Sequence, residues 1–116
     1  MLVLVVEDDP STRDAVVAML EELDVTEIET ANDGEQALKM LEHRKFGTLL
    51  LDLMMPKVDG YEVLRALRSG THIRPDRVIV MSAHILPAEL DGLMELGADA
   101  LMPKPFSMST LEKLIS

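Results

Sequence analysis

Five polar side chains stand at the ends of short apolar runs of this chain, and together they could do chemistry. They are Glu7, Asp8, Asp52, Ser82 and Lys104. An aspartate can attack phosphorus as a nucleophile, while an ammonium and a hydroxyl can stabilise the charge of a moving phosphoryl group. The set therefore fits phosphoryl transfer to a carboxylate, with Asp52 as the acceptor and Lys104 and Ser82 as its helpers.

The acidic members of this set also predict a metal site. Carboxylates that lie close together disfavour each other's ionisation unless a cation neutralises them. A site built from oxygens suits Mg²⁺, which keeps several waters and often pairs with a phosphate. Zinc is disfavoured because the chain has no cysteine, and because His43, His72 and His84 lack the spacing of metal ligands.

The elements that must position these residues can be read from the apolar pattern. Short runs rich in β-branched residues or leucine predict five strands, at Leu2 to Val6, Thr26 to Ala31, Thr48 to Leu51, Arg77 to Met81 and Asp99 to Leu101. Segments with helical spacing separate the strands, and a short last helix begins at Ser107. The alternation predicts an α/β fold with a doubly wound parallel sheet that is covered on both faces. Ligands bind beyond the carboxyl ends of the strands in such sheets, so we expect the polar residues to meet there.

Residues that favour the ends of helices support these boundaries. Asp9, Asp33, Asp59 and Ser107 each place a side-chain acceptor over free N–H groups, so each is expected to be a helix N-cap. Gly97 is expected to end a helix.

Each residue of the site has an ordinary alternative when it is taken alone. Ser82 could bond only to backbone, and Lys104 between its two prolines could be a solvated loop residue. Asp52 is less easily explained in that way, because it comes directly after a buried leucine run where an unpaired charge is expensive. The combination of residues favours a site.

Length and charge exclude several classes of protein. The 116 residues are expected to form one domain, residues 1–116. The formal net charge of −10 disfavours direct binding to nucleic acid or to anionic membrane surfaces. There is no apolar run of about 20 residues and no recognisable secretory signal, so a cytoplasmic location is expected.

Four segments carry a family resemblance that covers essentially the whole chain. The strings VLVVEDDPSTRD, LLLDLMMPKVDGYEVL, VIVMSAH and MPKPF resemble the receiver domain of bacterial two-component response regulators. The resemblance implies a flavodoxin-like (βα)5 fold with strand order 2-1-3-4-5. It also implies residue roles, with Glu7 and Asp8 as the acidic pair, Asp52 as the phosphoacceptor, Ser82 as the hydroxyl switch residue, Lys104 as the lysine before a cis proline, and the Met54 backbone carbonyl as a metal ligand.

The same resemblance implies partners and a mechanism of signalling. A histidine kinase or a histidine phosphotransfer protein would phosphorylate Asp52 with the help of Mg²⁺, and the face of helix 4, strand 5 and helix 5 would bind a downstream protein or output domain. The chain would be a monomer or a phosphorylation-dependent homodimer. It would catalyse only its own phosphorylation and dephosphorylation. One departure is Leu101, where the family often has an aromatic switch residue.

Two alternative functions have specific consequences. An interaction module that never takes phosphate would bind its partner regardless of Asp52, and Leu101 is the residue that favours it. An enzyme is disfavoured, because the acidic loop at residues 7–9 would repel a flavin phosphate and because Met54 stands where an aspartate-based phosphatase would usually have a second acid.

Overall fold

The computed structural model describes residues 1–83 and 85–116, and in them five strands alternate with five helices. The strands are β1 (Leu2–Val6), β2 (Glu27–Ala31), β3 (Thr48–Asp52), β4 (Arg77–Ser82) and β5 (Ala100–Pro103). The helices are α1 (Pro10–Glu22), α2 (Gly34–Leu41), α3 (Gly60–Arg68), α4 (Pro87–Glu95) and α5 (Met108–Ile115). This alternation confirms the predicted α/β class.

All four strand pairings are parallel, and the strand order is β2-β1-β3-β4-β5, as the resemblance implied. Val6 lies opposite Leu51, and Asp52 lies opposite Met81. The central strands therefore end at nearly the same level, and the residues beyond their ends meet along one edge of the sheet.

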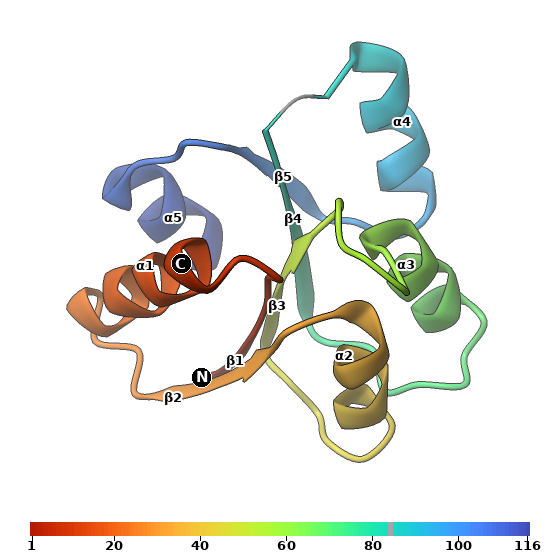
Figure 1. Ribbon diagram of the computed structural model, residues 1–116, viewed down its shortest axis with the longest axis horizontal. Coiled ribbons are helices and arrows are strands. Elements are labelled where there is room, and N and C mark those ends of the chain that lie inside the picture. The colour runs from red at the N-terminus through yellow and green to blue at the C-terminus, as the bar shows by residue number, and fades with distance from the viewer. Residues whose placement is uncertain (84) are drawn as a thin grey trace.

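Helices cover both faces of the sheet (Figure 1). The helices α1 and α5 lie on one face, and α2, α3 and α4 lie on the other. Successive strand residues point to opposite faces, so Val3 and Val5 pack with α1 and α5, while Leu4 and Val6 pack on the other side. Burial on both faces explains why β1, β3 and β4 are nearly continuous apolar runs.

The four predicted N-caps are confirmed by hydrogen bonds. The side chains of Asp9, Asp33, Asp59 and Ser107 each accept a bond from the backbone N–H three residues later, at 2.8 to 3.2 Å. Gly97 has a φ of 104°, a conformation suited to glycine, where the chain leaves α4. None of the helices in the described residues combines the length and the hydrophobicity needed to cross a membrane.

β1 has the predicted bounds, whereas each of the other four strands differs from its predicted range by one or two residues at one or both ends. β3 and β4 each run one residue further, to Asp52 and Ser82, because the backbones of these polar residues still pair with the neighbouring strand. β5 begins at Ala100 rather than at Asp99, whose side chain accepts a hydrogen bond from the Val78 N–H at 2.7 Å.

Candidate functional site

The strand ends bring together the residues that the sequence singled out. Glu7 comes directly after β1, Asp52 and Ser82 are the last residues of β3 and β4, and Lys104 comes directly after β5. Glu7, Asp52 and Ser82 are at most 5% exposed, whereas Asp8 is exposed. Buried charges are costly unless they have partners. The burial of these carboxylates must therefore be compensated by the contacts that they make.

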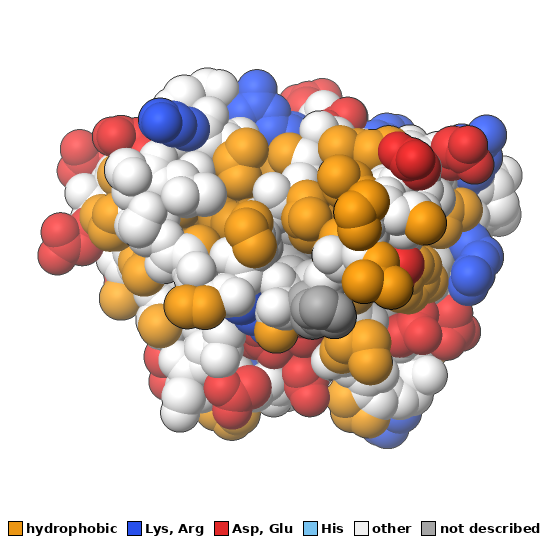
Figure 2. Space-filling model, turned by 90° about the horizontal axis from the view of Figure 1, so that it is seen from above, with side chains coloured by type: hydrophobic (Ala, Val, Ile, Leu, Met, Phe, Trp, Pro, Cys, Tyr) orange, Lys and Arg blue, Asp and Glu red, His pale blue; other side chains and the backbone are white. Residues whose placement is uncertain are grey.

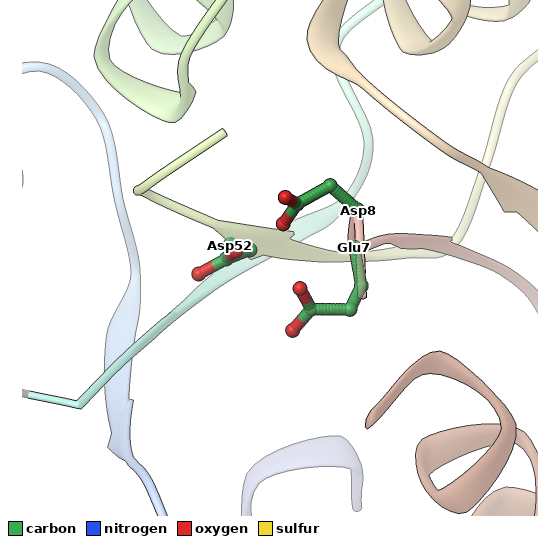
Figure 3. Close-up of side chains that lie close together, drawn as sticks. All are labelled: Glu7, Asp8 and Asp52. Carbon is green, nitrogen blue, oxygen red and sulfur yellow. The ribbon is translucent and has the colours of Figure 1, made fainter. Parts of the chain in front are cut away.

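Three carboxylates converge at the ends of β1 and β3 (Figure 3). Glu7, Asp8 and Asp52 each offer one oxygen, and these oxygens lie within 4.8 Å of one another. The donors are all oxygens, and one member of the group is open to solvent. This arrangement fits a hard cation such as Mg²⁺ and lets it keep part of its hydration.

Lys104 supplies the positive charge for the two buried acids. Its Nζ lies 2.6 Å from Oε1 of Glu7 and 3.2 Å from Oδ1 of Asp52. Burial acts to lower the pKa of Lys104, but the hydrogen bonds and charges of Glu7 and Asp52 outweigh it and raise that pKa above its usual value. The side chain therefore stays charged at neutral pH.

The segment around Lys104 is tied to the neighbouring strand. The Lys104 backbone N–H donates to the Ser82 carbonyl at 2.8 Å. The peptide bond from Lys104 to Pro105 is cis, as the resemblance implied. The residue that carries the ammonium is thus fixed directly beside the hydroxyl residue at the end of β4.

Glu7 and Asp8 have different surroundings although they are adjacent. One carboxylate oxygen of Glu7 accepts from Lys104, and the other accepts from the Asp9 N–H at 3.3 Å. The carboxylate of Asp8 makes no hydrogen bond or ion pair with any described residue. Asp8 therefore keeps its oxygens available for a cation, together with the second oxygen of Asp52.

The loop after Asp52 is held against the site by two glycines. The Gly60 N–H donates to the Leu53 carbonyl at 3.0 Å, and a Cβ on Gly60 would lie only 2.6 Å from the Asp52 carbonyl oxygen. The Gly34 N–H, at the start of α2, donates to the Val58 carbonyl at 3.2 Å. Met54 belongs to this loop, and its side chain is 76% exposed.

Two contacts near the site were not predicted from the sequence. Nη1 of Arg13 donates to the Glu7 carbonyl at 2.9 Å. Tyr61 comes directly after Gly60, and its hydroxyl donates to Oε2 of Glu89 at 3.4 Å. This contact links α3 to α4. Burial and the neighbouring Glu89 raise the pKa of Tyr61. In both pairs the partners lie on different segments, and the residue types alone give no signal of the contact.

Leu101 and two of the three histidines lie among the described residues. Leu101 is half-buried and packs against the apolar cluster beneath α2, α3 and α4. His43 is exposed, and the side chain of His72 is 13% exposed with Nε2 3.7 Å from Glu42. His84 lies outside the described residues.

Comparisons with known proteins agree on one family. A family model described as the response regulator receiver domain matches residues 3–116. Response regulator MprA of Mycobacterium leprae (strain TN) is 37% identical over 111 residues, which cover 96% of this chain and 47% of the relative. Response regulator Rre1 of Synechocystis sp. is 30% identical over 112 residues, which cover 97% of this chain and 48% of the relative. The chain thus spans about half the length of the curated relatives it matches.

Solved structures show the same architecture. Chemotaxis protein CheY4 of Vibrio cholerae superposes with a TM-score of 0.85 at 30% identity, over 96% of this chain and 92% of that one. The receiver domain of sensor histidine kinase PA1611 from Pseudomonas aeruginosa PAO1 superposes with a TM-score of 0.86 at 27% identity, over 97% of this chain and 92% of that one. The latter structure has a magnesium ion coordinated in its active site cleft.

Proposed function

The chain belongs to the family of response regulator receiver domains, the modules that are phosphorylated in two-component signalling, and from this premise we propose that it is a switch whose phosphoacceptor is Asp52. One observation carries the assignment. Asp52 ends β3 with 4% exposure, Lys104 lies 3.2 Å from its Oδ1, and the carboxylates of Glu7 and Asp8 lie beside it. We also propose that residues 1–116 form one receiver domain.

The chemistry of the donors supports Mg²⁺ as the cofactor. Asp8 and Asp52 would ligate the ion through their open oxygens, the Met54 backbone carbonyl would add a ligand, and Glu7 would complete the acidic pocket. When bound, Mg²⁺ would neutralise the acids and spread the negative charge of the phosphoryl group. The magnesium ion in the PA1611 receiver domain supports this choice.

The residues of the chain have separate parts in the transfer. An oxygen of Asp52 would form a bond to the donor phosphorus as the bond from phosphorus to the donor's imidazole nitrogen, or to the oxygen of acetyl phosphate, breaks. The ammonium of Lys104 would pair with the transferred group, and the Ser82 hydroxyl would donate to one of its oxygens. The product is an aspartyl phosphate, which puts new negative charge at the end of β3.

The partners are inferred from receiver domains in general, which interact with histidine kinases and downstream effectors. We propose that a sensor histidine kinase or a histidine phosphotransfer protein is the donor. The face of α4, β5 and α5 would bind the downstream protein or output domain. Figure 2 looks onto the side of α4 and α5, where apolar side chains gather, and Leu86 and Met94 of the α4 region are 53% and 42% exposed.

We also propose an oligomeric state, a location and a limit to catalysis. The chain would act as a monomer or as a phosphorylation-dependent homodimer, and it would work in the cytoplasm. It would turn over no external substrate and would catalyse only its own phosphorylation and dephosphorylation.

The test of the proposed function is the mass of the intact protein after incubation with acetyl phosphate and Mg²⁺. We expect the wild type to gain one phosphoryl group, and the Asp52→Asn variant to gain none. Asp91→Asn is the matched control, because Asp91 is an exposed aspartate on α4. Its side chain makes no hydrogen bond or ion pair with the described residues. No gain in the wild type, or an equal gain in Asp52→Asn, would contradict the proposal and favour an interaction module.

A further inference from the structure

Arg13, in the first turns of α1, reaches back to the loop that carries the acidic pair. Its Nη1 donates to the Glu7 carbonyl oxygen at 2.9 Å, in partly buried surroundings. This carbonyl belongs to the peptide unit that joins Glu7 to Asp8. The guanidinium therefore restrains the ψ angle of Glu7 and the φ angle of Asp8, two backbone torsions that set the directions of the acidic side chains relative to each other.

The other contacts of this loop hold the backbone on both sides of Asp8, and one of them runs from the Asp9 N–H to the Glu7 carboxylate at 3.3 Å. The Glu7 N–H donates to the Ala31 carbonyl at 3.1 Å, and the Asp9 carboxylate caps α1 by accepting from the Thr12 N–H at 3.0 Å. Both neighbours of Asp8 are thus bonded. The Asp8 carboxylate itself has no partner among the described residues, so only the backbone on either side fixes where it points.

We propose that Arg13 is a positioning residue for the Mg²⁺ site, an inference that rests on the proposed function of Asp52 and its acidic neighbours. Arg13 touches neither metal nor phosphate in this assignment. It acts through the Glu7 carbonyl and keeps the Asp8 carboxylate directed at the space it shares with Asp52. A ligand that is already oriented loses less conformational freedom on binding a metal, and supports of this kind are commonly worth about tenfold or more in metal affinity.

Because Arg13 is charged, the direction of the change in Mg²⁺ affinity on replacing it tests the proposal. A positive side chain beside an acidic pocket repels Mg²⁺, so removing it should strengthen Mg²⁺ binding if charge were its only contribution. Loss of a positioning contact should weaken Mg²⁺ binding. The two explanations thus predict opposite changes for the same substitution.

The experiment is a calorimetric titration of the whole chain with MgCl₂. We expect Arg13→Met to bind Mg²⁺ about tenfold more weakly than the wild type, by analogy with other residues that support metal ligands. Arg13→Lys keeps the charge and a donor on a long side chain, so it should recover most of the affinity. Arg65→Met is the matched control, because Arg65 is an exposed arginine of α3 whose side chain makes no bond with the described residues.

Each outcome decides the inference. Binding by Arg13→Met that equals or exceeds the wild type overturns it, and so does a weakening that Arg13→Lys fails to reduce or that Arg65→Met shares. If circular dichroism shows Arg13→Met to be unfolded, Arg13→Gln removes the same charge with a smaller change in polarity, and the same criteria apply. Absence of Mg²⁺ binding in the wild type would refute the proposed function itself, which is a different result.

Discussion

Among the single side chains of the site, Lys104 pairs with both of its buried carboxylates. It lies between two carboxylates that are almost fully buried, and its own side chain is 22% exposed. The residues it pairs with lie 97 and 52 positions away in the sequence. One ammonium thus joins the ends of β1 and β3 to the loop after β5.

Replacement of Lys104 by Met should leave Glu7 and Asp52 buried without their counter-charge. We expect the free energy of unfolding in EDTA to fall by about 2 kcal/mol, less than for a fully buried pair because the ammonium is partly solvated. Mg²⁺ should bind this variant more tightly than the wild type and should restore part of the loss. Urea unfolding with and without Mg²⁺ measures both effects, and Lys113→Met, an exposed lysine of α5, is the control.

The difference in unfolding free energy between the wild type and Lys104→Met should also depend on pH in a defined way. The pKa of Lys104 is raised in the folded state above its ordinary value of 10.5, so its stabilising contribution is complete below that pH and is lost as the pH rises through the folded-state pKa. The difference in unfolding free energy between wild type and Lys104→Met should stay constant from neutral pH to about pH 10. A difference that vanished already at about pH 8 would contradict the ion pairs as its source.

The sequence indicated these side chains for a physical reason that has limits. Glu7, Asp52 and Lys104 come directly after apolar runs, and parallel strands that end at one edge of a sheet bring the residues beyond their ends together. Arg13 has no such position. It lies within a helix and bonds to a main-chain carbonyl, which every residue possesses, so no pattern of residue types could have indicated the contact.

Among the connections between strands and helices, the junction of β3 and α3 begins directly after Asp52. A Cβ on Gly60 would lie 2.6 Å from the Asp52 carbonyl oxygen and 2.7 Å from the Leu53 Cα. Both are backbone atoms, which cannot move without displacing the end of β3. The glycine is required here by the close approach of two backbones.

Gly60→Ala should therefore destabilise the fold, although most substitutions by alanine in a helix do not. We expect a loss of about 2 kcal/mol or more in unfolding free energy, from overpacking, together with slower phosphorylation by acetyl phosphate. Gly92→Ala is the matched control, since nothing lies within 4 Å of a Cβ on that residue of α4. It should stabilise by about 0.5 to 1 kcal/mol because alanine is the better helix former. Equal effects of the two substitutions would contradict the close approach.

Helix starts were easier to predict than strand ends. An N-cap such as Asp59 acts on a backbone group three residues away, so the signal and its partner lie in the same short segment. A strand ends where its neighbour stops pairing with it. Asp52 and Ser82 still pair with Met81 and Pro103, which belong to other strands, and that information is not local. The order of the strands likewise came from the family resemblance rather than from the pattern of apolar residues.

Taken as one body, the molecule joins its site to its overall stability. A cation at the acidic edge would contact Glu7 and Asp8 after β1 and Asp52 at the end of β3. These residues come together only when the chain is folded. Any ligand that binds the folded state alone stabilises it by mass action.

Mg²⁺ should therefore raise the melting temperature. At about tenfold the dissociation constant the gain in unfolding free energy should be about 1.4 kcal/mol. For a domain of this size that gain corresponds to a shift of about 5 °C. The Asp8→Asn and Asp52→Asn variants should lose most of the shift, whereas Asp91→Asn should keep it. A melting temperature of the wild type that did not respond to Mg²⁺ would speak against a metal at this edge.

The contact between Tyr61 and Glu89 gives the chain a built-in optical probe. Tyr61 is the only tyrosine, and there is no tryptophan, so the ultraviolet emission of the chain comes chiefly from one phenol ring. Tyr61 comes directly after the glycine packed on Asp52, and its hydroxyl touches a carboxylate of α4. Movements of α4 relative to α3 could therefore be monitored by intrinsic fluorescence, in real time and without a dye.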